Sequence, residues 1–210
     1  MINLFKHIFN PSSNQHKEEN LTYSELKQQG IEAILGQMFY IVGHAIIPFK
    51  IGGSMNMYYF PSAQIKGTGF VTMELLTPER EIPIENKKGT YELLAFTKQV
   101  YNPQKETEFH QIERTICSIF TSIAFYSQET ALNPFDTCEI PTNEDESICI
   151  IFDIYSHFKI GKEKHHLLLC TQVFKEELEY AQEKGTKKLI RKLKKAGYYP
   201  YSDLNRQAVV

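Results

Sequence analysis

The chain has 210 residues, 42% of them hydrophobic, and a formal net charge of −2. This length suggests one domain or two small ones and suffices to bury a sizeable core. The 14 Phe and 12 Tyr side chains argue against disorder throughout. A nearly neutral chain does not recruit nucleic acid or membranes by bulk electrostatics. We recognise neither a secretory signal nor an apolar run of about 18 residues that predicts a transmembrane helix.

The N-terminal third predicts a linker followed by a helix. Residues 1–20 are expected to form an N-terminal extension and linker, because the stretch PSSNQHKEEN is polar throughout. A helix is expected over about residues 22–43, with Thr22 and Glu25 spaced as a capping box. Gly30 interrupts this pattern, which leaves open whether the segment forms one helix or two.

The rest of the chain alternates runs of strands with helices. Strands are predicted at residues 55–60, 70–76, 91–97, 148–154 and 165–173, and helices at about 107–126, 174–183 and 186–196. The residues between 127 and 147 are expected to be a loop with two prolines and an acidic run. Gly197 lies where a glycine ends a helix. This order of elements indicates an α+β fold rather than a regular βαβ alternation.

The four cysteines indicate reduced thiols rather than disulfides. They lie far apart and form no CxxC pair: Cys117, Cys138, Cys149 and Cys170. Three of them fall in apolar patterns, which is typical of buried thiols in a cytoplasmic protein.

Two carboxylates, Glu74 and Glu92, fall within predicted strands. A pair of carboxylates on one face of a sheet can carry acid–base catalysis. Glutamates in strands are more often exposed or hydrogen-bonded to a basic group, so both interpretations stay open.

The remaining residues that carry chemistry give no pattern for a metal or a cofactor. His165 and His166 are adjacent on a predicted strand and therefore point to opposite faces, so they cannot chelate together. Neither HExxH, paired CxxC, GxSxG, a Walker motif nor a dinucleotide motif occurs. We expect no metal, no cofactor and no catalytic residue.

The C-terminal stretch, residues 184–210, begins with a basic amphipathic helix. Its lysines and arginine can form a patch for phosphate or an acidic partner, or the solvated face of a helix that buries Leu189, Ile190 and Leu193. Glutamates of the preceding helix can neutralise this charge.

The helix is followed by the motif YYPYSDLNR, residues 198–206. Tyrosines offer a large contact area with a polar tip. Asp203 and Arg206 are close enough to pair locally, or each can anchor a partner. Two interpretations stay open: a clasp that docks the tail on the sheet, and a protein-binding edge that includes Tyr199 and Tyr201.

Several segments of the chain resemble the suppressor of fused-like family in its bacterial form. They are LGQMFYIVGHAIIPF (35–49), MYYFP (57–61), GTGFVTMEL (67–75), GTYELLAFTK (89–98), LNPFDTCEIP (132–141) and the ending VFKEELEYAQEKGTKKLIRKLKKAGYYPYSDLNR (173–206). The resemblance covers about residues 31–210, and we expect a suppressor of fused-like domain over residues 21–210.

The resemblance implies an α+β fold with a mixed, largely antiparallel sheet flanked by helices, and no catalytic activity. In animals the family member is a larger regulator that sequesters a transcription factor. Bacterial relatives often act as immunity proteins, or antitoxins, that block partner toxins.

Three hypotheses therefore follow. The first is a non-enzymatic, cytoplasmic immunity protein that binds a toxin, with Asp203, Arg206, Tyr199, Tyr201, Glu74 and Glu92 as candidate contacts. The second is a small hydrolase built on Glu74, Glu92 or a histidine. The third is a nucleic-acid-associated regulator that uses the basic C-terminal helix.

Overall fold

The computed structural model describes residues 21–61, 64–79, 82–104, 106–143 and 146–210. The predicted extension and linker, residues 1–20, lie outside the described residues. The helices are α2 (Tyr23–Leu35), the 3₁₀ turn η2 (Phe49–Ile51), α3 (Glu108–Tyr126), α4 (Lys175–Lys184) and α5 (Thr186–Lys195). The strands are β1 (Val42–Gly43), β2 (Met57–Phe60), β3 (Thr68–Val71), β4 (Tyr91–Thr97), β5 (Thr137–Pro141), β6 (Ser147–Ile160) and β7 (Glu163–Val173). None of the helices within the described ranges is long and apolar enough to cross a bilayer.

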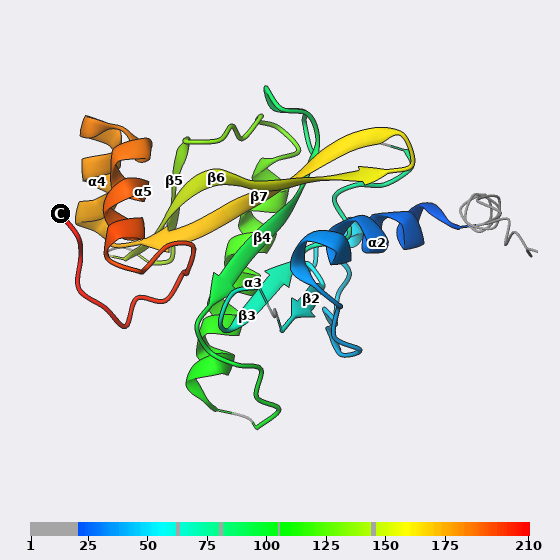
Figure 1. The fold of residues 1–210 in the computed structure, drawn as a ribbon, viewed down its shortest axis with the longest axis horizontal. Coiled ribbons are helices and arrows are strands. Elements are labelled where there is room, and N and C mark those ends of the chain that lie inside the picture. Colours follow the sequence, from blue (N-terminus) through cyan, green and yellow to red (C-terminus); the bar gives the residue numbers. More distant parts are fainter. Residues whose placement is uncertain (1–20, 62–63, 80–81, 105, 144–145) are drawn as a thin grey trace, which may run out of the picture.

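One sheet organises the molecule (Figure 1). Its seven strands run in the order β1-β2-β3-β4-β7-β6-β5. Every neighbouring pair is antiparallel except β4 and β7, which pair in parallel at the centre. The α+β class with a mixed, largely antiparallel sheet is therefore confirmed.

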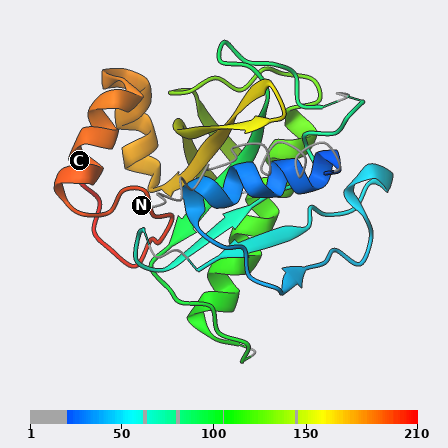
Figure 2. The same cartoon turned by 45° about the vertical axis from the view of Figure 1, so that its right-hand side comes forward.

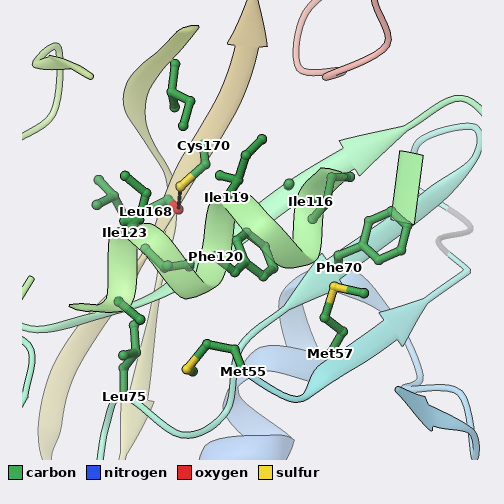
Figure 3. Packing of buried hydrophobic residues seen from close by; sticks show 14 of the residues in the cluster. Met55, Met57, Phe70, Leu75, Ile116, Ile119, Phe120, Ile123, Leu168 and Cys170 are labelled. Atoms are coloured by element: carbon green, nitrogen blue, oxygen red, sulfur yellow. Dashed lines mark hydrogen bonds between the residues drawn. The ribbon is translucent and has the colours of Figure 1, made fainter. Parts of the chain in front are cut away.

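Helix α3 covers one face of the sheet. Its apolar residues recur at helical spacing, and Ile116, Ile119, Phe120 and Ile123 are all buried. Figure 3 shows them packed against residues that come from the strands and the segments beside them, among them Met57, Phe70, Leu75 and Leu168. The predicted helix over 107–126 and its core stripe are confirmed.

Helix α2 covers the opposite face (Figure 2). Its predicted capping box is present, since the Thr22 hydroxyl accepts from the Glu25 amide and the Glu25 carboxylate accepts from the Thr22 amide. Gly30 does not divide the helix. A Cβ at Gly30 would lie 2.6 Å from the Lys159 carbonyl oxygen. The glycine therefore lets α2 approach β6 closely.

Helices α4 and α5 pack at one end of the sheet, near β5 and β6 (Figure 1). Leu178, Leu189 and Leu193 form a third buried cluster with Ile151 and Val173 of the sheet. On β7, Val173 lies on the same face as Leu167 and Leu169, which pack near α2. These two helices and α2 therefore share one face, and α3 has the other.

The prediction of a helix as far as residue 43 was wrong. Helix α2 ends at Leu35, and Gly36 follows with a φ of 87°, a value that favours glycine. The apolar residues beyond it join the sheet instead: the Phe39 amide donates to the Tyr59 carbonyl at 2.8 Å, and Val42 pairs with Tyr58.

Further boundaries differ from the prediction. Strand β6 continues to Ile160, although a strand was predicted over 148–154. Residues 137–141, expected to be a loop, form the edge strand β5, which pairs with β6. Strand β3 begins at Thr68 and ends at Val71, although a strand was predicted over 70–76. The ladder ends there because the amides of Leu75 and Leu76 donate to the Glu92 carboxylate rather than to a neighbouring strand.

Candidate functional site

The C-terminal tail lies between β4 and β7, where these two strands separate. Tyr201 forms a parallel bridge with Phe96 of β4, and the Ser202 amide donates to the Phe96 carbonyl at 2.8 Å. On the other side, the Ser202 hydroxyl accepts from the Gln172 amide at 3.1 Å and donates to the Cys170 carbonyl at 3.3 Å. The tail thus extends the sheet hydrogen bonding where the two strands separate.

Asp203 and Tyr199 add side-chain contacts to the same docking. The Asp203 carboxylate accepts from the Thr97 hydroxyl at 2.7 Å and from the Lys98 amide at 3.0 Å. The Tyr199 hydroxyl donates to the Asp153 carboxylate at 2.9 Å. Burial, followed by the negative charge of Asp153, raises the pKa of Tyr199 well above its usual range, so this tyrosine stays a donor.

Arg206 closes the tail with a buried, bidentate ion pair. Its two terminal nitrogens lie 2.7 and 2.6 Å from the carboxylate oxygens of Glu177 on α4. The side chains of the two residues are only 4% and 0% exposed. The guanidinium also lies over the rings of Phe174 and Tyr198, and the Glu177 carboxylate accepts from the Val209 amide.

The four tail residues that were predicted as partner contacts therefore all contact their own chain. Asp203 and Arg206 do not pair with each other, because each is held by a different element: β4 and its following residue hold Asp203, and α4 holds Arg206. Tyr199 and Tyr201 remain half-buried. The contacts are those of a clasp, and contact with a partner remains a prediction.

Glu92 is a structural centre inside the protein. It is 0% exposed, and Lys27 of α2 donates to it at 2.9 Å. It also accepts from the Thr72 hydroxyl at 2.7 Å and from the amides of Leu75 and Leu76. Lys27 in turn donates to the Leu76 carbonyl at 2.6 Å. A charge this well satisfied fixes α2 and the segment after β3 to the sheet.

Glu74 is held by other groups. It accepts from the backbone amide and the side-chain amide of Asn56 at 2.9 and 2.6 Å. The Asn56 side-chain oxygen then accepts from the Ala45 amide at 2.9 Å. Burial, assisted by the charges of Glu74 and Glu92, raises the pKa of Tyr58. Glu74 and Glu92 thus lie in one region, but each accepts hydrogen bonds from a different segment of the backbone.

The histidines of β7 are part of the interior. Burial, together with the charges of His157 and His165, lowers the pKa of His166 to about 4. The His166 Nε2 atom lies 3.2 Å from the Asn86 side-chain amide, and the His165 Nδ1 atom lies 2.7 Å from the Thr90 hydroxyl. Across the described ranges, no three His, Cys, Asp or Glu side chains gather into a possible metal site.

The cysteine side chains are free thiols. Burial raises the pKa of each of them: Cys117, Cys138, Cys149 and Cys170. A thiol with a raised pKa is a poor nucleophile, so these side chains serve packing.

Helix α5 presents its cations outward. Leu189, Ile190 and Leu193 are buried as predicted, and the lysines and arginine are exposed. Three ammonium groups lie over aromatic rings: Lys187 over Phe135, Lys192 over Tyr180 and Lys194 over Tyr199. Lys188, Arg191 and Lys195 recur at helical spacing and form the outward stripe.

The sequence patterns did not identify an exposed apolar loop at residues 44–52. Ile46, Ile47 and Ile51 are 101%, 56% and 74% exposed. Periodicity misses such a loop because these residues belong to no long helix or strand. One feature of the sequence could have drawn attention to this region: no acidic residue occurs between Glu32 and Glu74.

Two comparisons with known proteins point to the same family over part of the chain and to the same fold. The family model described as Suppressor of fused protein (SUFU) matches residues 109–207. A solved chain from a structure described as "the Sufu-Fu complex crystal structure" matches with a TM-score of 0.59 at 13% identity, and the match covers 88% of this chain and 90% of that chain. At this low sequence identity, the structural similarity shows a shared fold and nothing about function. No curated protein matches the chain.

Proposed function

We propose that the chain is a non-enzymatic protein-binding domain and that it acts as an immunity protein, sequestering a partner toxin. The match of residues 109–207 to the suppressor of fused family model supports the protein-binding role. The solved chain of similar fold comes from a complex of Sufu with Fu, which supports a protein as the partner.

The non-enzymatic part of the proposal rests on what the candidate catalytic carboxylates contact. Glu92 holds Lys27 and two backbone amides inside the protein, and Glu74 accepts from the backbone and side-chain amides of Asn56. An acid–base catalyst has to reach a substrate proton within hydrogen-bond distance. Carboxylates committed to backbone and ion pairs in the interior support scaffolding rather than hydrolysis.

The interface is also part of the proposal. Of the six residues predicted as contacts, Tyr199, Tyr201, Asp203 and Glu74 are partly exposed, the Arg206 side chain is 4% exposed, and Glu92 is buried. We propose that Tyr199, Tyr201 and Asp203 contribute to recognition directly and that Arg206, Glu74 and Glu92 contribute through the fold. An inhibitor needs a shaped surface with a few anchors rather than perturbed catalytic groups.

Co-expression tests the function. The full chain is expressed together with the product of each gene adjacent to its own, and growth and direct binding are measured. We expect one neighbour to be toxic alone and harmless with the chain, through a stable complex. Absence of both binding and protection with every neighbouring product would contradict the immunity role.

A nucleic-acid role has one favouring observation, the outward stripe of Lys188, Arg191 and Lys195 on α5. It predicts binding to duplex DNA that weakens steeply with salt. Charge reversal at these three positions would abolish such binding while leaving toxin protection intact. DNA binding that survives the reversal would argue against this alternative.

A further inference from the structure

The apolar loop, residues 44–52, turns one side chain inward and three outward. Phe49 is 4% exposed, and its ring centroid lies 4.6 Å from that of Phe125 on α3. Ile46, by contrast, is 101% exposed and Ile51 is 74% exposed. Figure 2 shows this segment at the edge of the molecule, far from α4 and α5. Large apolar residues gathered at an exposed projection are typical of protein interaction sites.

The loop is held in one conformation by its own backbone. The Ser54 amide donates to the Ile47 carbonyl at 3.1 Å, and the Gly53 amide donates to the Pro48 carbonyl at 3.0 Å. Gly53 makes this closure possible, because a Cβ at that position would lie 1.7 Å from the Ile47 carbonyl oxygen. A preformed loop loses little conformational entropy when it binds.

The loop is also tied to the body of the protein. The Ala45 amide donates to Asn56 at 2.9 Å, and Asn56 is held by Glu74. This link assigns Glu74 a positioning role: its carboxylate fixes Asn56, and Asn56 fixes the start of the loop. Phe49 anchors the other side against α3.

The charge around the loop selects the chemistry of its occupant. Residues 44–52 contain Lys50 and no acidic residue. The carboxylate linked to the loop, Glu74, accepts both of its hydrogen bonds from Asn56. An apolar tip beside Lys50 complements an apolar groove with an acidic rim. Anionic membranes are instead recruited by clusters of about 4–8 basic residues, and this loop carries a single lysine, Lys50.

We propose that residues 44–52 are a second docking element of this chain, in addition to the tail, and that Ile46, Ile47 and Ile51 enter an apolar, acid-rimmed groove on a partner protein. This inference rests on the proposed protein-binding function and names a further surface and the partner chemistry that it uses. Lys50 faces the acidic rim.

The first experiment compares three full-length chains for binding to the neighbouring toxin: the wild type, Ile46→Asp combined with Ile51→Asp, and Val100→Asp. Val100 is a matched control because it is 65% exposed and aliphatic. It also lies near the other end of α3, where Tyr101 contacts Phe109. Thermal unfolding verifies that all three chains fold.

The double variant is expected to bind at least about 30-fold more weakly, the loss typical of interface anchors, and the Val100→Asp variant as well as the wild type. Lys50→Glu should slow association and reduce its dependence on salt. Wild-type affinity in the double variant overturns the docking assignment and leaves the proposed function standing. Cosedimentation of the wild type, but not the double variant, with phosphatidylserine vesicles overturns it in favour of lipid.

If no neighbouring toxin binds, the proposed immunity function is contradicted. A second experiment still tests whether residues 44–52 form a docking element. Isotope-labelled chain is titrated with two synthetic amphipathic peptides that share a leucine face, one carrying glutamates and the other lysines. Amide shifts at residues 44–52 are expected with the acidic peptide alone. Absence of shifts in this loop with both peptides overturns the proposal.

Discussion

Glu92 illustrates how a residue can be placed correctly by pattern while its role stays hidden. The β-forming residues in 91–97 predicted its strand, and the structure has that strand with the same bounds. The partner of Glu92, Lys27, comes from a helix 65 positions away. Periodicity reports which face a residue lies on, but not which distant charge meets it there.

The interior pair of Glu92 and Lys27 gives a stability prediction. Glu92→Gln keeps the shape of the side chain but leaves the Lys27 ammonium buried without a counter-charge. We expect the free energy of unfolding to fall by about 3–5 kcal/mol, measured by urea denaturation. Adding Lys27→Met should recover a large part of the loss. A Glu92→Gln effect no larger than that of Glu74→Gln, a partly exposed site, would contradict this assignment.

His166 gives a prediction about pH. Burial lowers its pKa to about 4 in the folded state, whereas an unfolded histidine titrates near about 6.5. Between these values the unfolded chain binds the proton and the folded chain does not, so stability is complete above pH ~6.5 and falls as pH drops toward ~4, by roughly 3 kcal/mol.

Urea unfolding at a series of pH values measures this slope. His166→Phe is expected to flatten it between about pH 6.5 and about pH 5, above the range in which carboxylates titrate. The exposed His44→Phe is the control and should keep the wild-type slope. An unchanged slope in the His166 variant would place the proton uptake elsewhere.

At the scale of single helices and strands, local sequence motifs predicted where α2 begins, but the sequence did not predict where several elements end. The Thr22–Glu25 spacing predicted the start of α2, because a capping box is formed within four residues. Its end at Gly36 was missed, since the residues after it remain apolar and only their pairing with β2 makes them extended. Strand β5 was missed for the same reason, because only its pairing with β6 makes it extended, and Pro141, its last residue, is typical of a loop.

The tail is the element with the sharpest test. Arg206→Ala leaves the Glu177 carboxylate buried and unpaired, and we expect a loss of about 3–5 kcal/mol. Because the tail then loses its outer anchor, backbone amides from residue 198 to residue 209 should exchange hydrogen faster. Lys175→Ala, which breaks the exposed pair with Glu139, should change neither quantity measurably. Slow exchange along the tail of the Arg206 variant would mean that Tyr199 and Ser202 suffice to hold it.

At the scale of the whole molecule, the class of fold was predictable and its central feature was not. The order of strands and helices, together with the family resemblance, predicted an α+β domain with a mixed sheet. The parallel pairing of β4 with β7, and the insertion of Tyr201 and Ser202 beside it, join segments far apart in sequence. A single sequence carries no direct signal for such pairings.

The same topology predicts how the chain responds to truncation. Residues 198–210 contribute strand-like bonds to β4 and β7, the Tyr199–Asp153 bond and the Arg206–Glu177 pair. Deleting them should lower the free energy of unfolding by roughly 4 kcal/mol or more, because buried acceptors and a buried carboxylate lose their partners.

Removing residues 1–20 tests the proposed domain boundary at residue 21. The urea midpoint of that truncated chain should match the full chain, since the first described helix begins with its own cap at Thr22. The two deletions together decide where the domain lies. A large loss on removing residues 1–20, or a folded and equally stable chain without residues 198–210, would show that the cooperative unit has other limits than 21–210.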